Sequence, residues 1–308
     1  MTILIGLAHG KRDDAAVHLG GLLARSSAED VVVVSVVQAP WPPDPSRGDK
    51  EYLAYQQDQA EIALNRARQQ LDASSLGAEF TVRRAESAPA GLLQVAEERR
   101  CSSVVVGSST MGLMGHVMLG GVAERLLHSA ELPIIVAPRG FHAAPAGTVT
   151  QVSVAFGRAD HDSGLIARSG SVARNLGAGL RVVCFSVRPV TAMLGGVENS
   201  AEQLVVEQWK QRLDADIASA LASSRSSSPQ GSDRLVATRV ETALGQGSSW
   251  SAALHDVSWR EGDLLAVGIS SGPLGRLFLG SHAAKIVRSS PVPVMLLSRR
   301  QESHSHST

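Results

Sequence analysis

The chain has few aromatic residues, few cysteines and no excess of charge of either sign. Aromatic residues make up 4% of its 308 residues, and 29 basic side chains are balanced by 29 acidic ones. This balance argues against a surface built to bind a polyanion, so nucleic acid is not expected as the main partner. Cys101 and Cys184 are the only cysteines and form no CxxC pair. This excludes a disulfide framework and a thiolate metal site, and we expect both to be small buried hydrophobes.

Long hydrophobic runs are also missing. No apolar run approaches the roughly 20 residues that a membrane-spanning helix needs, and the first residues, MTILIGLAHG, carry no basic segment before a long hydrophobic stretch. We therefore expect a cytoplasmic protein without a membrane partner. Hydrophobic residues still make up 44% of the chain, which is typical of a globular protein with sizeable cores. The length favours two domains.

An internal repeat is the most informative feature of the sequence. Residues 103–140 read SVVVGSSTMGLMGHVMLGGVAERLLHSAELPIIVAPRG, and residues 263–300 read DLLAVGISSGPLGRLFLGSHAAKIVRSSPVPVMLLSRR. Each has an apolar strand, a glycine-rich loop, a helix of about ten residues, x-Pro and a second apolar strand. Further upstream, ILIGLAHG pairs with VSVAFGRA, and VVVVSVV pairs with RVVCFSV. The chain is therefore a tandem duplication. Its seam lies near residues 138–148, and an additional polar loop lies at residues 222–233.

Within each repeat, short runs of Val, Ile and Leu alternate with longer amphipathic segments. In repeat one this pattern predicts strands at residues 3–7, 31–37, 80–83, 103–106 and 133–137, and helices at about residues 13–26, 52–71, 89–99 and 121–129. Continuously apolar strands are buried on both faces, which indicates a parallel sheet covered by helices on both sides. We predict two tandem doubly wound α/β domains of Rossmann-like type, residues 1–140 and 149–300, and a disordered tail at residues 301–308.

The glycine-rich segments lie where such sheets bind ligands, between a strand end and a helix N-terminus that favours anions. The stretch GRLFLGS has the glycine spacing of a P-loop, but Ser281 and His282 occupy the positions that require Lys and Ser/Thr. No GxGxxG follows a strand, and the HxGH and SGGxDS patterns of nucleotidylyl-transferring and pyrophosphatase-type relatives are absent. These absences disfavour a P-loop NTPase, a dinucleotide enzyme and an adenylating enzyme.

A strand ending in Gly, a glycine loop, Gly-Ser, a helix, x-Pro and a final apolar strand together resemble the universal stress protein family, here in tandem form. The resemblance covers nearly all of residues 1–300 and implies two adenine-nucleotide alpha-hydrolase-like domains, each with a five-stranded parallel sheet. Many members bind ATP through G-x2-G-x9-G-[ST] and carry an aspartate at the end of the first strand. The resemblance thus implies a stress-response regulatory protein with ATP as its ligand.

Carried over residue by residue, this motif is imperfect in both repeats. In repeat one, Gly107 takes the first position, Thr110 replaces the second glycine, and Gly120 and Gly121 take the last two, so the final hydroxyl is lost. Repeat two keeps that hydroxyl at Ser281, but its second glycine aligns with Ser271 or Gly272, and with Ser271 the following stretch is one residue short. The candidate residues of repeat two are Gly268, Gly272, Gly275, Gly280 and Ser281. Because of Ser281, we expect a phosphate first in repeat two.

The expected aspartate is missing from both repeats, since Ala8-His9 and Gly157-Arg158 stand at the ends of the first strands. His9, Arg158 and the loop residue Arg276 are candidates for contacting a phosphate, and the alternative for each is a solvated side chain. The aspartates further along, Asp13, Asp14, Asp160 and Asp162, are expected to cap helices. Losing one hydrogen bond to a charged group costs roughly 1.5 to 3 kcal/mol, which is enough to weaken a micromolar site severely.

No catalytic residue and no metal site are predicted. The serines after the strands lack a GxSxG context and a readable His-acid pair, so they are expected to stabilise loops. The final strands, LPIIVA and VPVMLL, are expected to pair with each other and give an internal pseudo-dimer, with a homodimer as a further option; the alternative is burial within each domain. Trp41 and residues 193–224 are expected in the second crossover of each repeat, where a protein partner could be recognised.

Three hypotheses remain open. The first is a non-enzymatic regulatory protein that binds ATP or a related adenine nucleotide. The second is a nucleotide-independent interaction module of the same fold, and the third is an enzyme acting on a nucleotide or phosphorylated metabolite. The glycines at strand ends favour the first hypothesis, and the missing aspartates favour the second.

Overall fold

The structure is a computed structural model that describes residues 1–9, 14–38, 47–72, 76–109, 111–129, 132–157, 159–187, 211, 215, 240–271 and 277–298. Repeat one contains β1 (Thr2–Leu7), α1 (Ala15–Ser27), β2 (Asp30–Gln38), α2 (Arg47–Asp72), β3 (Ala78–Ala85), α3 (Ala88–Glu98), β4 (Cys101–Gly107), α4 (Gly121–Ser129) and β5 (Ile134–Ala137). Repeat two contains β6 (Gln151–Ala155), α5 (Ala159–Asn175), β7 (Gly179–Val187), β8 (Glu241–Gly247), α8 (Trp250–His255), β9 (Asp263–Ser271), β10 (Leu277–Phe278), α9 (Ser281–Ser289) and β11 (Val294–Ser298).

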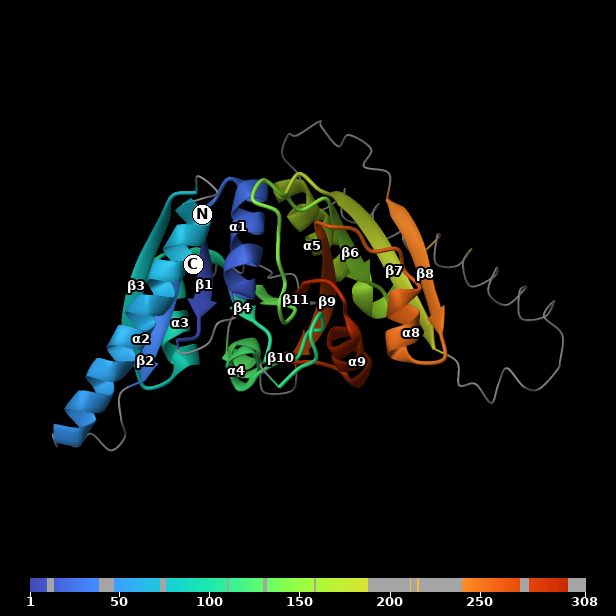
Figure 1. Ribbon diagram of the computed structural model, residues 1–308. Coiled ribbons are helices and arrows are strands. Elements are labelled where there is room, and N and C mark those ends of the chain that lie inside the picture. Colours follow the sequence, from blue (N-terminus) through green and yellow to red (C-terminus); the bar gives the residue numbers. More distant parts are fainter. Residues whose placement is uncertain are drawn as a thin grey trace, which may run out of the picture.

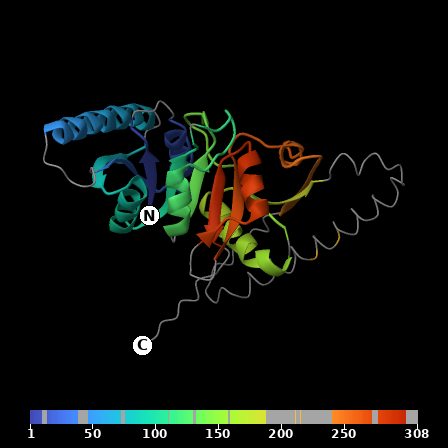
Figure 2. The ribbon, with the colours of Figure 1, turned by 90° about the horizontal axis from the view of Figure 1, so that it is seen from below.

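The strands of both repeats join in one sheet with the order β3-β2-β1-β4-β5-β11-β9-β6-β7-β8, and β10 pairs with β9 outside this path. Within the described residues, each repeat contributes five parallel strands. The repeats meet at β5 and β11, which run antiparallel with Met295 opposite Ile135. In Figure 1 the sheet continues from the blue strands of repeat one to the red and orange strands of repeat two. Figure 2 shows the same two halves side by side from below. The predicted tandem doubly wound class is confirmed.

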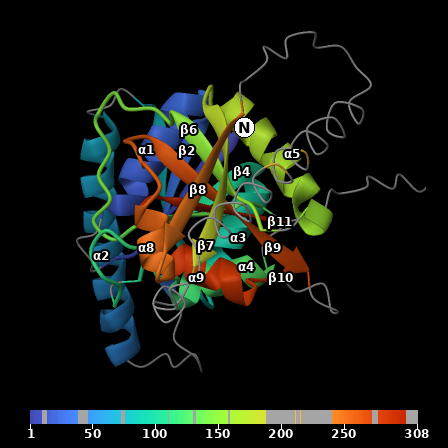
Figure 3. The same ribbon diagram turned by 90° about the vertical axis from the view of Figure 1, so that its right-hand side faces the viewer.

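Helices cover both faces of the sheet because its strands are apolar on both sides. In β2, for example, every residue from Val31 to Val37 is buried. One core packs α1, α2 and α5 against the sheet, and the other packs α3, α4, α8 and α9 against the opposite face. Figure 3, a view onto the β8 edge, shows α5 and α8 on opposite sides of β7 and β8. Each core includes residues of both repeats, so the two halves share their hydrophobic interior.

The connection between the repeats is fixed to α1. The Arg25 guanidinium donates from Nε to the carbonyl of Gly147 at 2.8 Å, and the Val149 amide donates to the Ser26 hydroxyl at 2.8 Å. The rings of His18 on α1 and His142 on the connection lie with their centroids 4.0 Å apart. The seam expected near residues 138–148 is therefore a packed segment.

The helix caps differ from the expectation at α1. Asp14 occupies the N-cap position, but its side chain makes no capping hydrogen bond. Its carboxylate instead accepts a hydrogen bond from Gln70 at 2.9 Å and lies 3.6 Å from Arg66 on α2. The expected capping role of Asp14 is therefore wrong, because its carboxylate instead connects α1 to α2. Ser87 and Ser249 cap α3 and α8 through their hydroxyls.

Both cysteines are buried, as expected, and neither forms a disulfide with a described residue. Burial raises the pKa of the Cys101 thiol to about 11, which keeps it protonated and unreactive near neutral pH. Asp160 and Asp162 lie within α5. The expectations for Asp13, Trp41, most of residues 193–224 and the tail 301–308 fall outside the described residues.

Candidate functional site

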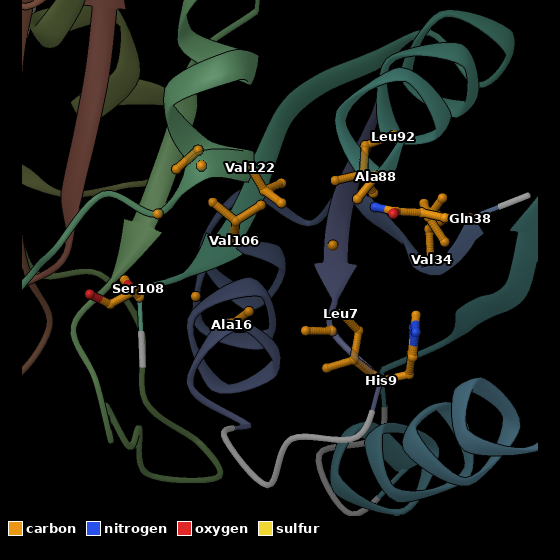
Figure 4. Close-up of a pocket in the computed structure, with 18 residues that line it drawn as sticks. Leu7, His9, Ala16, Val34, Gln38, Ala88, Leu92, Val106, Ser108 and Val122 are labelled. Carbon is orange, nitrogen blue, oxygen red and sulfur yellow. The ribbon is translucent and has the colours of Figure 1, made fainter. Parts of the chain in front are cut away.

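A cavity of about 310 Å³ lies at the carboxyl ends of β1, β2 and β4 in repeat one and reaches the first residues of α3 and α4. Figure 4 shows the residues that line it. β1 is paired with β2 on one side and β4 on the other, so the strand order reverses at this point. Doubly wound sheets bind their ligands at such a switch point, and cavities of about 300 Å³ or more accommodate small molecules. The described part of repeat one thus has a cavity at the position that the fold favours.

One wall of the cavity is apolar. It is formed by Val34 and Val36 of β2 and by Ala88 and Leu92 of α3, with Val106 of β4 nearby. Val34 and Leu92 also belong to the core between the sheet and α3. Their positions are therefore set by core packing and do not need a ligand to hold them. Such a wall suits the flat apolar face of a ligand.

Two polar side chains stand at the strand ends beside this wall, His9 after β1 and Gln38 at the end of β2. Burial lowers the pKa of His9 from its ordinary value of 6.5, so its imidazole is neutral at pH 7. Figure 4 shows His9 and Gln38 across the cavity from Val122 at the start of α4. His9 therefore lies away from the helix terminus at which a phosphate was expected.

Ser108 lines the cavity, but its hydroxyl is engaged in holding the glycine-rich loop. It accepts a hydrogen bond from the Met118 amide at 2.6 Å and lies 3.0 Å from the Met118 carbonyl oxygen, to which it donates. Arg139 fixes the same loop from outside by donating to the Gly112 carbonyl at 2.8 Å. The expectation that serines after the strands stabilise loops applies to Ser108, and the loop that borders the cavity is fixed at both sides.

Glycines keep the opposite side of the cavity open. A Cβ atom added at Gly107 or at Gly121 would meet no atom within 4 Å, and both residues line the cavity. Gly120 precedes the helix, and its carbonyl accepts from the Glu124 amide at 2.9 Å. The N-terminal amides of α4 therefore lie next to open space, which is the arrangement that binds an anionic group.

The structure brings four of the predicted site residues of repeat one together around this cavity, namely His9, Gly107, Gly120 and Gly121. Thr110 lies outside the described residues. Sequence reasoning missed Gln38 and the apolar wall. The available signal for Gln38 was its place as the polar residue that ends the valine-rich run of β2.

In repeat two the candidate residues are more dispersed. Gly268 lies inside β9, opposite Leu297, because the strand continues to Ser271 and pairs with β10. This extension was not predicted. Gly280 is the N-cap of α9 and Ser281 is its first residue, and a Cβ at Gly280 would meet nothing within 4 Å. The other candidates, Arg158, Gly272, Gly275 and Arg276, lie outside the described residues.

The loop of repeat one also contacts repeat two. The ring centroids of His116 in this loop and His255 at the end of α8 lie 6.0 Å apart. Met111, Leu113 and Met114 of this loop are exposed to solvent, with 87% of the Met111 surface accessible. This loop thus borders the cavity, contacts repeat two and exposes apolar side chains to solvent.

Two kinds of site are not seen in the part of the chain that the structure describes. It contains no cluster of three or more His, Cys, Asp or Glu side chains that could hold a metal ion. Among the described helices, none combines the length and apolar character of a membrane-spanning segment.

Fold and cavity together define a tandem, doubly wound α/β protein with a cavity at the switch point of repeat one. A family model described as the universal stress protein family matches residues 1–138 and 150–298. A universal stress protein of Mycobacterium tuberculosis is 33% identical over 301 residues, which cover 96% of this chain and 99% of the relative. The chain therefore belongs to the universal stress protein family, and the resemblance seen in its loops is confirmed.

A solved structure of similar length agrees with this fold. A universal stress protein from Archaeoglobus fulgidus covers 96% of this chain and 98% of its own, with a TM-score of 0.57 and 16% identity. A shorter protein of the same family and organism, solved in complex with dAMP, covers 44% of this chain and 97% of its own, with a TM-score of 0.35 and 16% identity.

Proposed function

We propose that this universal stress protein is a non-enzymatic regulator that binds ATP or a related adenine nucleotide in the cavity of repeat one. Its two domains are taken as residues 1–140 and 149–300. The observation that carries the proposal is the 310 Å³ cavity at the switch point, with an apolar wall on one side and the open N-terminus of α4 on the other. The base would lie on the wall formed by Val34 and Leu92, and the phosphates would face Gly120 and Gly121.

The residues around the cavity fit such a ligand in shape more than in charge. The described lining contains no carboxylate, and His9 stands at the end of the first strand. Nucleotide binding would therefore rest on apolar contacts, backbone amides and the two polar side chains His9 and Gln38. Gly280 and Ser281, at the start of α9, make repeat two the second candidate for a phosphate contact.

The first test is to fill the cavity. Replacing Gly107 by leucine places a side chain in open space, so the fold should be retained while nucleotide affinity falls by at least about a hundredfold, since the ligand and the leucine cannot occupy the same volume. Isothermal titration calorimetry with ATP, ADP and AMP measures this change. Gly77→Leu is the matched control, because its Cβ also meets nothing within 4 Å and the residue lies outside the cavity.

A second test restores the hydroxyl that repeat one lacks. Gly121→Ser adds a side chain where there is free space, and its hydroxyl can donate to a phosphate at the start of α4. We expect the affinity for ATP to rise about tenfold, as for a hydrogen bond to a charged group, with no change for adenosine. An equal change for adenosine and ATP would contradict the placement of the phosphates at α4.

A nucleotide-independent interaction module is the alternative function. Two observations favour it, the absence of a carboxylate among the described cavity residues and the exposed Met111, Leu113 and Met114 in the loop of repeat one. Mass spectrometry and absorbance at 260 nm of the natively purified chain distinguish the two functions. The alternative predicts no co-purified nucleotide and no heat with millimolar ATP.

A further inference from the structure

We propose that Gln38, assisted by His9, reads the base of the nucleotide and selects adenine over guanine. The inference rests on the proposed function, since it assigns a specificity-determining residue to the same cavity. Gln38 and His9 lie at the end of the cavity formed by β1 and β2. The variants at Gly107 and Gly121 change the other end, which is formed by β4 and α4.

The position of Gln38 follows from strand pairing. β1 and β2 are parallel and their last paired residues are Leu7 and Ser35, so His9 and Gln38 both lie beyond the last β1–β2 pair, and Gln38 is held in the sheet by its pairing with Ala85 of β3. Both side chains line the cavity next to the apolar wall. Within the described part of the chain the Gln38 carboxamide makes no hydrogen bond, so its donor and its acceptor are both available to a ligand.

The chemistry of a carboxamide matches one edge of adenine. It offers one N–H donor and one carbonyl acceptor side by side. Adenine presents an N6 donor next to the N7 acceptor, whereas guanine presents two acceptors, O6 and N7, along the same edge. Gln38 can therefore form two hydrogen bonds with adenine and only one with guanine. The lowered pKa of His9 leaves a neutral imidazole beside it, which can supply one further donor or acceptor.

Repeat two provides an internal comparison. Thr2 pairs with Asp30 in repeat one and Gln151 pairs with Gly179 in repeat two, and β2 and β7 both have nine residues. Val187, the last residue of β7, therefore occupies the position that corresponds to Gln38, one residue away from the pairing of VVVVSVV with RVVCFSV that the sequence suggested. Valine has no hydrogen-bonding group in its side chain. Base selection by this strand end is thus expected in repeat one and not in repeat two.

Calorimetry on the full chain with three nucleosides tests the proposal. The unmodified chain should bind adenosine about tenfold more tightly than guanosine, and 7-deazaadenosine, which lacks N7, should bind several-fold more weakly than adenosine. Gln38→Val should lower the affinity for adenosine about tenfold and remove both differences. Gln38→Glu keeps an acceptor for N6 but lacks the donor for N7, so its affinity for adenosine should lie between the two.

Gln246→Val is the matched control, because Gln246 is an exposed glutamine near the carboxyl end of β8 and outside the cavity of repeat one. It should leave all three affinities unchanged, and thermal unfolding should give equal midpoints for all variants. If Gln38→Val retains the preference for adenosine while Gly107→Leu abolishes binding, base selection by Gln38 is wrong but nucleotide binding in the cavity is supported. If neither nucleosides nor nucleotides bind the unmodified chain, the proposed function is wrong and the inference falls with it.

Discussion

Replacing Asp263 by alanine is expected to lower the free energy of unfolding by about 3–5 kcal/mol, as observed when one partner of a buried ion pair is removed. Asp263 and Arg181 form such a pair at the start of β9 and β7, with 2.9 Å between Nη2 and Oδ2 and side chains that are 9% (Arg181) and 1% (Asp263) exposed. The guanidinium also donates to the Ser153 hydroxyl at 2.9 Å and to the Ser258 carbonyl at 3.1 Å. The Trp259 ring lies 5.0 Å from it. Without the carboxylate, a buried positive charge remains uncompensated.

Urea unfolding followed by circular dichroism measures this loss. The double variant Arg181→Met with Asp263→Leu removes both charges and should regain most of the lost stability. Arg83→Ala is the surface control, because its ion pair with Glu98 is 33% and 51% exposed and such pairs contribute at most about 1 kcal/mol. A loss as small for Asp263→Ala as for Arg83→Ala would show that the buried pair does not stabilise repeat two.

The second large effect is expected at the junction of the repeats. Ile135 is 1% exposed, lies opposite Met295 across the antiparallel pair and opposite Val105 within repeat one. Ile135→Ala should therefore lower the free energy of unfolding by about 2–5 kcal/mol, as for other buried Ile→Ala replacements. Because the core that contains Ile135 includes residues of both repeats, we expect both halves to lose stability together in one transition.

Two probes distinguish a shared transition from two separate ones. Circular dichroism reports on all helices, and tryptophan fluorescence reports mainly on repeat two, which holds Trp209, Trp250 and Trp259, whereas repeat one holds Trp41. Val33→Ala in β2, whose site is fully buried but remote from the junction in the strand order, is the control. If the halves unfolded independently, Val33→Ala would shift only one of two transitions and Ile135→Ala would shift both. Coincident curves for each variant are the expected result.

The sequence predicted the fold well because hydrophobic pattern and repetition are strong signals. Each predicted strand and helix of repeat one is present, since continuous apolar runs in a parallel sheet are long enough to identify without tertiary information. The ends of the strands and helices were predicted less accurately. β3 extends from Ala78 to Ala85 although only residues 80–83 were predicted, because its outer residues, at the edge of the sheet, are Ala, Glu and Arg and lack the apolar β-branched side chains that mark a strand.

The candidate site was predicted only in part. The glycine motif selected Gly107 at the end of β4 and Gly120 and Gly121 at the start of α4, and all three line the cavity. The glycine motif gives no information about the apolar wall on the other side of the cavity. Val34 and Leu92 of this wall come from distant segments of the sequence that meet only in the folded chain. Asp14 was assigned a capping role from its position, but its partners Gln70 and Arg66 lie on α2, more than 50 residues away in sequence. Such contacts leave no local signal.

The most direct test of the central claim is calorimetric titration of the full, nucleotide-free chain with ATP and AMP, performed side by side with Gly107→Leu. We expect saturable binding with a dissociation constant in the micromolar range for the unmodified chain. For Gly107→Leu we expect no measurable heat and an unchanged thermal midpoint. Absence of heat from the unmodified chain at millimolar nucleotide, or equal affinity in Gly107→Leu, would contradict a nucleotide site in the cavity of repeat one.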